Sequence, residues 1–196
     1  MALVEHRLPR WIKPQLTRLA EEAPKGTGWL HEIKYDGYRM HARIDGGKIQ
    51  LLTRTGLDWS HRYKRTIEVL HSLKVKSAYL DGELCALNAE GVPAFSRLQA
   101  AMDEGRTDQL VFFAFDLLYL NGESTAQLPL IKRKERLGRL FNKETQGLRY
   151  TASTSLLTVL AFSNTPASWG SKASSQSGST GHTLPATVGF GLNPNA

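Results

Sequence analysis

The sequence predicts an α+β fold in which an antiparallel-rich sheet is flanked by helices. Stretches of alternating apolar and polar residues follow one another with short glycine-containing turns between them, a pattern typical of antiparallel strands. A later stretch is short and almost entirely apolar, as expected for a central strand that is buried on both faces. Apolar residues also recur one helical turn apart, which indicates amphipathic helices packed on the sheet.

Three strands are expected in the first part of the chain. They cover residues 30–35, 38–44 and 48–53. A tight turn at Asp36-Gly37 would join the first two strands, and Asp45-Gly46-Gly47 would form a hairpin turn between the second and the third. This arrangement would hold the amine of Lys34 at the lip of a hairpin.

The remaining elements follow from the same patterns. Two further strands are expected over residues 78–87, with a bend at Gly82, and over residues 110–119. Helices are expected over residues 61–73, 95–102 and 131–140. The last of these helices is basic, so it could add to an attraction for DNA.

Composition and charge narrow the class of protein. A chain of 196 residues holds one domain, or a domain and a fragment, and its net charge of +7 favours a nucleic-acid partner. The single cysteine, Cys85, cannot form an internal disulfide, which agrees with a reducing cytoplasm. We expect no membrane segment, no signal peptide and no zinc site, because no suitable apolar run or paired histidine spacing is present.

Several polar residues are candidates for chemistry, and each also has a plain structural explanation. A lysine is a nucleophile only when neutral, and partial burial or a nearby cation such as Arg39 would favour that form of Lys34; a solvated lysine in a surface turn is the alternative. Asp81 and Glu83 share one face of a regular strand and would need a cation or hydrogen-bond donors, unless both lie in water. Arg54 could simply be solvated at a strand end.

Four motifs, in order, resemble those of a known family. Lys34-Tyr35-Asp36-Gly37-Tyr38-Arg39 resembles the Lys-x-Asp-Gly-x-Arg signature of covalent nucleotidyltransferases: ATP-dependent DNA ligases, RNA ligases and mRNA capping enzymes. Thr53-Arg54-Thr55-Gly56, Asp81-Gly82-Glu83 and Phe115-Asp116-Leu117-Leu118 match further elements of that family. Together with the residues from His31 onward, they look most like the ligase domain of bacterial end-joining ligase D. The resemblance covers residues 11–150.

This resemblance implies an ATP-grasp-like adenylation domain that performs ATP-dependent DNA ligation. Lys34 would attack the α-phosphate of ATP and carry AMP as a phosphoramidate. Five other residues would surround the nucleotide: Glu32 near the adenine, Arg39 and Arg54 at ribose or phosphate, Glu83 at the ribose and Mg²⁺, and Phe115 stacked on the base. Phe115 is preferred to Phe113 for stacking because of its place in the motif; without the motif, Phe115 reads as a core residue.

The resemblance also implies partners and leaves alternatives open. The substrate would be nicked or broken double-stranded DNA in repair and recombination, and end-joining repair proteins would be further partners. One alternative is another covalent nucleotidyltransferase, either an RNA ligase or a capping enzyme. The other is a catalytically dead ligase remnant with weak nucleotide or DNA binding.

The chain is expected to divide into three parts. Residues 1–28 form a lead-in, residues 29–150 the adenylation domain, and residues 151–196 an atypical tail. The tail contains no Asp or Glu and only one basic residue, Lys172, a composition typical of disorder. Two later elements of the family are missing in frame, but a shifted reading of plausible codons resembles both. We therefore expect a frameshift near Tyr150 and an adenylation domain that is incomplete at its C-terminus.

Overall fold

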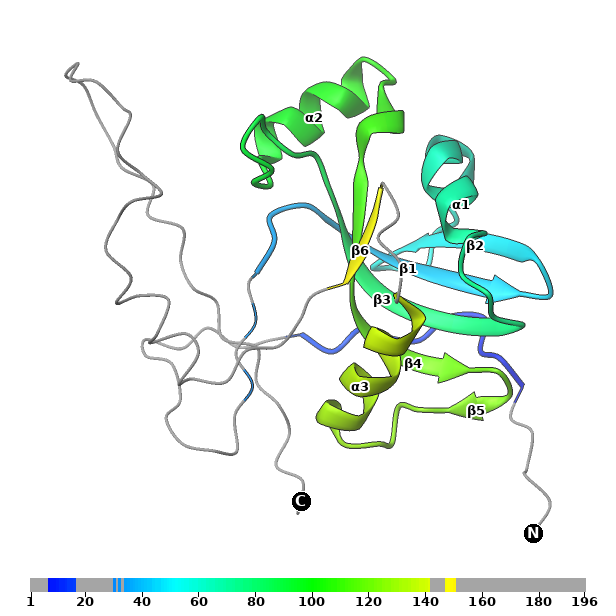
Figure 1. Ribbon diagram of the computed structural model, residues 1–196. Coiled ribbons are helices and arrows are strands. Elements are labelled where there is room, and N and C mark those ends of the chain that lie inside the picture. Colours follow the sequence, from blue (N-terminus) through cyan, green and yellow to red (C-terminus); the bar gives the residue numbers. More distant parts are fainter. Residues whose placement is uncertain (1–6, 17–29, 31, 33, 142–146, 151–196) are drawn as a thin grey trace, which may run out of the picture. The chain divides into compact units, whose positions relative to one another are not determined.

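The computed structural model describes residues 7–16, 30, 32, 34–141 and 147–150 (Figure 1). The chain forms two compact units, and all described helices and strands belong to the first. The units are Met1–Leu16 with Tyr35–Ala152 and Ala196, and Thr17–Lys34 with Ser153–Asn195. The predicted tail, and most of the predicted lead-in, lie outside the described residues.

The first unit is built on a six-stranded sheet in the order β2-β1-β3-β4-β5, in which β6 also pairs with β4. The strands are β1 (Tyr38–Asp45), β2 (Lys48–Thr53), β3 (Ser77–Cys85), β4 (Val111–Leu120), β5 (Glu123–Ser124) and β6 (Leu148–Tyr150). All pairings are antiparallel except that of β4 with β6. The predicted antiparallel-rich sheet with flanking helices is therefore confirmed.

Helices cover one face of this sheet. They are α1 (Lys64–Leu70), α2 (Phe95–Asp103) and α3 (Leu130–Leu140), with short 3-10 helices at Ser60–Arg62 and Thr107–Gln109. Leu70, Leu98 and Leu137, one from each α-helix, belong to the same buried cluster as Met40 of β1 and Phe112 of β4. None of the helices in the described part of the chain is long and apolar enough to span a membrane.

The predicted strand over residues 30–35 and its hairpin turn are wrong at the residues that the structure describes; residues 31 and 33 lie outside that part of the chain. The described residues of that range have no regular structure, Gly37 lies in a bend, and β1 begins at Tyr38. Tyr38 pairs with Leu84, and β3 ends one residue later at Cys85. Alternating polarity alone does not make these residues a strand, because a strand also needs a neighbouring backbone edge to which it can hydrogen-bond.

The predicted helix over residues 61–73 is also shorter than expected. Its first part is the 3-10 turn Ser60–Arg62, and α1 follows at Lys64–Leu70. Tyr63 separates the two with a non-helical backbone (φ −125°, ψ 52°), and its side chain is fully buried. Tertiary packing of this ring therefore divides a stretch whose apolar spacing alone favours one helix.

Candidate functional site

The face of the sheet opposite the helices carries charged and aromatic side chains. Because successive residues of a strand point to opposite faces, the odd-numbered residues of β1 and β3 lie here while Met40 and Leu80 enter the core. The pairing places Arg39 opposite Glu83 and His41 opposite Asp81. The face therefore brings together two of the predicted motifs that lie about forty residues apart in the chain.

Arg39 is held rigidly by a carboxylate that sequence reasoning had not assigned to the site. Its Nε and Nη2 donate to Asp81 Oδ1 and Oδ2 at 3.1 and 2.6 Å, and its Nη1 donates to the carbonyl of Gln15 at 2.9 Å. Burial lowers the pKa of Arg39, but the bonds and charges of Asp81 and the nearby carboxylates outweigh it, so the pKa is raised. The guanidinium stays charged, and the buried Asp81 has the cation that it needs.

Glu83 lies beside this pair on the same face, as predicted. Burial raises the pKa of Glu83 to about 7. The positive charge of Arg39 and a backbone hydrogen bond from Gly37 oppose this shift, whereas the charges of Asp81 and Asp36 add to it. Gly37 fits closely here, because a Cβ on it would lie 2.4 Å from the carbonyl oxygen of Leu84. Glycine therefore lets the chain approach β3 closely enough for its N–H to reach the Glu83 carboxylate.

A β-bulge presents Phe115. Asp81 pairs with Asp116 and Gly82 pairs with Ala114, so Phe115 is an extra residue of β4 in this register, as Leu118 is at a second register shift. Bulges of this kind bend a strand and redirect a side chain. The Phe115 ring is half-buried, and its centroid lies 5.3 Å from Cζ of Arg39, a distance suited to a cation–π contact.

Phe113 has a different environment. It is 3% exposed and stacks on Tyr35 with ring centroids 4.2 Å apart. Phe115 therefore offers ring surface that a ligand can reach, whereas Phe113 is part of a packed cluster with Cys85 and Val111. This contrast favours the predicted choice of Phe115 as the stacking residue.

A second ion pair braces the bulge. Arg133 of α3 donates from Nε and Nη2 to the two oxygens of Asp116 at 2.8 and 2.9 Å, and from Nη1 to the carbonyl of Leu128 at 2.7 Å. Asp116 also accepts the backbone N–H of Leu117 at 2.8 Å. The sequence predicted that Asp81 needs a cation, but it assigned no site role to Asp81, Asp116 or Arg133. The available signal was the presence of carboxylates within apolar strands, since buried carboxylates require a charged partner.

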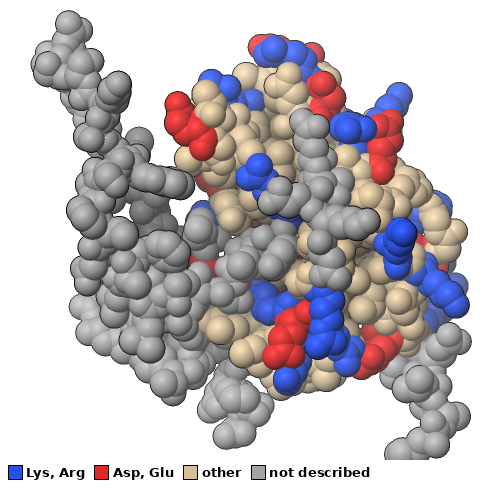
Figure 2. All heavy atoms as spheres, viewed as in Figure 1, with Lys and Arg blue, Asp and Glu red and all other residues tan. Residues whose placement is uncertain are grey.

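The other basic residues of α3 are partly neutralised as well. Lys132 pairs with Glu135 at 3.1 Å, and Arg136 pairs with Glu123 at 2.7 Å. Figure 2 shows basic and acidic side chains close together on the described surface, over α3 among other places. The positive charge of this helix is therefore less concentrated than its sequence suggests.

The remaining predicted site residues lie elsewhere. Arg54 is exposed in the turn after β2 and has no ion pair among the described residues. Lys34 is exposed and Glu32 is half-buried, and both belong to the second compact unit. The structure thus brings Arg39, Glu83 and Phe115 together within the first unit, and Lys34 is the residue before that unit's segment Tyr35–Ala152.

The donor groups on this face suit a nucleotide, and they suit a metal ion only together with a nucleotide. No group of three metal-ligating side chains occurs among the residues that the structure describes. Asp81 and Asp116 each engage an arginine with both oxygens, which leaves Glu83 as a carboxylate without such a pair. One carboxylate suits Mg²⁺, which keeps several waters and often binds through substrate phosphates. An accessible ring beside a fixed guanidinium suits a nucleotide.

Comparison with known proteins identifies the family. Residues 14–165 match the ATP-dependent DNA ligase domain family. "Multifunctional non-homologous end joining protein LigD" of Pseudomonas aeruginosa is 40% identical over 147 residues, 74% of this chain and 17% of that protein. The Mycobacterium tuberculosis protein "Multifunctional non-homologous end joining DNA repair protein LigD" is 36% identical over 118 residues, 60% of this chain and 15% of that protein. The chain thus spans less than one fifth of the length of these relatives.

Solved structures of related ligases also resemble the fold of this chain. The ligase domain of M. tuberculosis LigD has a TM-score of 0.56 at 32% identity, with 65% of this chain and 40% of that chain covered. A mycobacterial DNA ligase D in complex with ATP and MES also has a TM-score of 0.56, at 31% identity. The match covers 68% of this chain and 45% of that chain. These findings confirm the family that the motifs predicted and its adenylation-domain fold. The chain therefore belongs to the ATP-dependent DNA ligase domain family.

Proposed function

We propose that this chain is the adenylation domain of an ATP-dependent DNA ligase that seals nicks or breaks in double-stranded DNA. One observation carries the proposal. Arg39, Glu83 and Phe115 meet on one face of the sheet, and Arg39 lies five residues after Lys34 in the chain. A base-stacking ring, a charged fork for phosphate or ribose and a carboxylate are the groups that a nucleotide site requires.

In this reaction Lys34 is the nucleophile. Its neutral amine attacks the α-phosphorus of ATP, so that an N–P bond forms while the bond to pyrophosphate breaks and the amine loses a proton to solvent. The 5′-phosphate of DNA then takes the AMP and releases the lysine. Finally, the 3′-hydroxyl of the nick attacks that 5′-phosphate, AMP departs and the phosphodiester bond is complete.

The other residues bind and orient the nucleotide. Phe115 stacks on adenine with Glu32 nearby, and Arg39 and Arg54 contact ribose or phosphate. Because Arg39 donates three hydrogen bonds to described residues of the chain, two of its five N–H groups remain for a ligand. Glu83 would hold the ribose and Mg²⁺, in its ionised form. Bound Mg²⁺ would offset phosphate charge and assist the departure of pyrophosphate.

The similarity to bacterial end-joining proteins favours DNA over RNA or an mRNA cap as the substrate. Action on chromosomal DNA would place the protein in the cytoplasm, with end-joining repair proteins as partners. The inactive remnant is the alternative that composition favours, because residues 151–196 lack the charged residues expected of the two later family elements.

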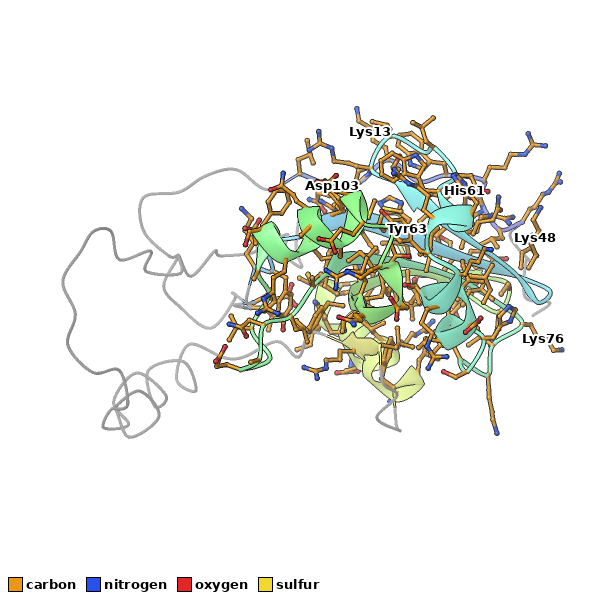
Figure 3. The ribbon with its side chains drawn as sticks, turned by 90° about the horizontal axis from the view of Figure 1, so that it is seen from above. Lys13, Lys48, His61, Tyr63, Lys76 and Asp103 are labelled. Atoms are coloured by element: carbon orange, nitrogen blue, oxygen red, sulfur yellow. The ribbon has the colours of Figure 1, made fainter. Side chains whose placement is uncertain are left out.

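Intact-protein mass spectrometry after incubation with ATP and Mg²⁺ tests the proposal. The expected result is a covalent increase of one AMP that disappears in Lys34→Ala and persists in Lys13→Ala, an exposed lysine labelled in Figure 3. An adduct with GTP rather than ATP would indicate capping chemistry. No adduct with either nucleotide would identify an inactive remnant. Joining of a nicked duplex by the full chain tests the remaining steps.

A further inference from the structure

Residues 7–16, here called the strap, lie along the charged face of the sheet. The carbonyl of Pro9 accepts a hydrogen bond from Arg43 Nε at 2.9 Å. Leu8 is buried in a cluster with Tyr79 and Tyr119. Trp11 packs against Gly56, where a Cβ would lie 3.2 Å from the indole ring. The strap is thus part of the first compact unit.

A series of polar contacts leads from the strap into the sheet. The backbone N–H of Ile12 donates to the Tyr79 hydroxyl oxygen at 3.0 Å. The same hydroxyl lies 2.7 Å from Nδ1 of His41, whose ring is fully buried. On the other side of the ring, Nε2 lies 3.4 Å from Oδ1 of Asp81. That separation is long for a hydrogen bond, so the contact is a charge–dipole contact.

The chemistry of these groups determines where the protons lie. Burial raises the pKa of Tyr79 to about 12, and burial lowers the pKa of His41, an effect that the charge of Asp81 opposes. Tyr79 is therefore a protonated phenol and His41 a neutral imidazole with one N–H. An unprotonated Nε2 would direct its lone pair at the Asp81 carboxylate, so the proton belongs on Nε2. Nδ1 then accepts the hydroxyl proton of Tyr79.

The series of contacts closes on the strap. Asp81 holds Arg39 through two hydrogen bonds, and Arg39 donates to the carbonyl of Gln15. The network therefore begins at the amide of Ile12 and ends three residues later on the same segment. Every member between these backbone groups is a side chain on β1 or β3.

We propose that His41 and Tyr79 are positioning residues of the nucleotide site, which act through Asp81 to fix the Arg39 guanidinium beside Phe115. The inference rests on the proposed function, in which Arg39 and Phe115 bind ATP. An arginine that is held in place before the ligand arrives loses less side-chain freedom on binding. The strap completes the site, because it supplies the first donor and the last acceptor of the network.

The first test compares Tyr79→Phe with Tyr63→Phe in the full chain. Both tyrosines are fully buried, but the hydroxyl of Tyr63 has no hydrogen-bond partner among the described residues. Figure 3 labels Tyr63. Tyr79→Phe should increase amide hydrogen exchange in peptides from the strap and weaken ATP binding about tenfold, which corresponds to about 1.4 kcal/mol. Tyr63→Phe should change neither.

The second test determines the proton position directly. In protein with ¹⁵N-labelled histidine, the His41 ring, assigned by its loss in His41→Gln, should show the neutral tautomer with the proton on Nε2. Tyr79→Phe should shift the Nδ1 resonance, because that nitrogen loses its donor. A charged His41, or a proton on Nδ1, would overturn the network.

The remaining outcomes are also decisive. Unchanged strap exchange in Tyr79→Phe overturns the network, and a looser strap with unchanged ATP affinity overturns the positioning role. If the unaltered chain binds no ATP, the proposed function fails and the positioning role fails with it. The exchange and tautomer measurements distinguish that case, because they report on the network without ATP.

Discussion

The two faces of the sheet are stabilised in different ways. On the helix-covered face, Met40 and Phe112 enter a cluster of buried apolar side chains. On the opposite face Arg39 binds both carboxylate oxygens of Asp81, and at the bulge of β4 Arg133 of α3 binds both oxygens of Asp116. Apolar burial is non-directional and contributes stability, whereas ion pairs cost desolvation and depend on geometry. We therefore expect the first face to contribute most of the stability and the second to hold the proposed nucleotide-binding groups in place.

The largest effect is expected from removing a ring on the helix-covered face. Phe112 is fully buried, and its ring packs directly against Gly82. Phe112→Ala should lower the free energy of unfolding by about 3–5 kcal/mol through lost burial and a cavity. Denaturant unfolding measures this loss.

Phe115→Ala is the matched variant on the other face. Its ring is only half-buried, so the stability loss should be smaller, while ATP binding should be strongly reduced. Equal losses of stability in the two variants would contradict the proposed division between the faces.

The next effect is a pH dependence that arises from Glu83 in the metal-free protein. Its pKa is raised from 4.5 to about 7 by burial, so folding favours the protonated carboxyl. This contribution to stability is complete below about pH 4.5 and disappears as the pH rises through about 7. Relative to Glu83→Gln, the unaltered chain should lose up to about 3 kcal/mol over that range.

Unfolding of both proteins at a series of pH values measures this difference. Parallel stability curves for the two proteins would show that Glu83 titrates normally, and the charged face would then be better solvated than its contacts indicate.

A smaller effect is expected at the bulge. Asp116→Asn removes the charge that Arg133 binds, and the two side chains are 15% and 11% exposed. The loss of stability should be about 1–3 kcal/mol, less than for a completely buried pair. Because the pair braces the bulge that presents Phe115, ATP affinity should fall as well. A fall in stability without any change in ATP affinity would show that the ion pair supports the fold but not ATP binding.

The smallest effect should come from an exposed pair. Arg65 and Glu68 lie on the surface of α1, with side chains 51% and 64% exposed. Glu68→Gln should change the free energy of unfolding by less than about 0.5 kcal/mol, because solvent screens such pairs. It serves as the control for Asp116→Asn in the same unfolding experiments, and a comparable loss would mean that burial does not distinguish the two pairs.

Local patterns predicted most of the elements, and the resemblance to a family supplied the four motifs. The strand over residues 48–53 was predicted with its observed bounds, and the Asp45-Gly46-Gly47 turn contains two glycines with positive φ, as a tight hairpin requires. The same reasoning failed for residues 30–35, where alternation is present but β3 has already ended. The roles assigned to all the site residues stay predictions: Lys34, Glu32, Arg39, Arg54, Glu83 and Phe115.

By itself, the sequence determined the alternation that separates a charged face from an apolar one, and the motif residues Arg39, Glu83 and Phe115. Only the tertiary structure decided that Phe115 occupies a bulge, that Arg133 braces it from α3, and that the strap completes a network through His41. The physical reason is how far apart in the sequence the interacting residues lie. Alternation is a property of neighbouring residues, whereas register, bulges and buried ion pairs depend on which distant segments pack together.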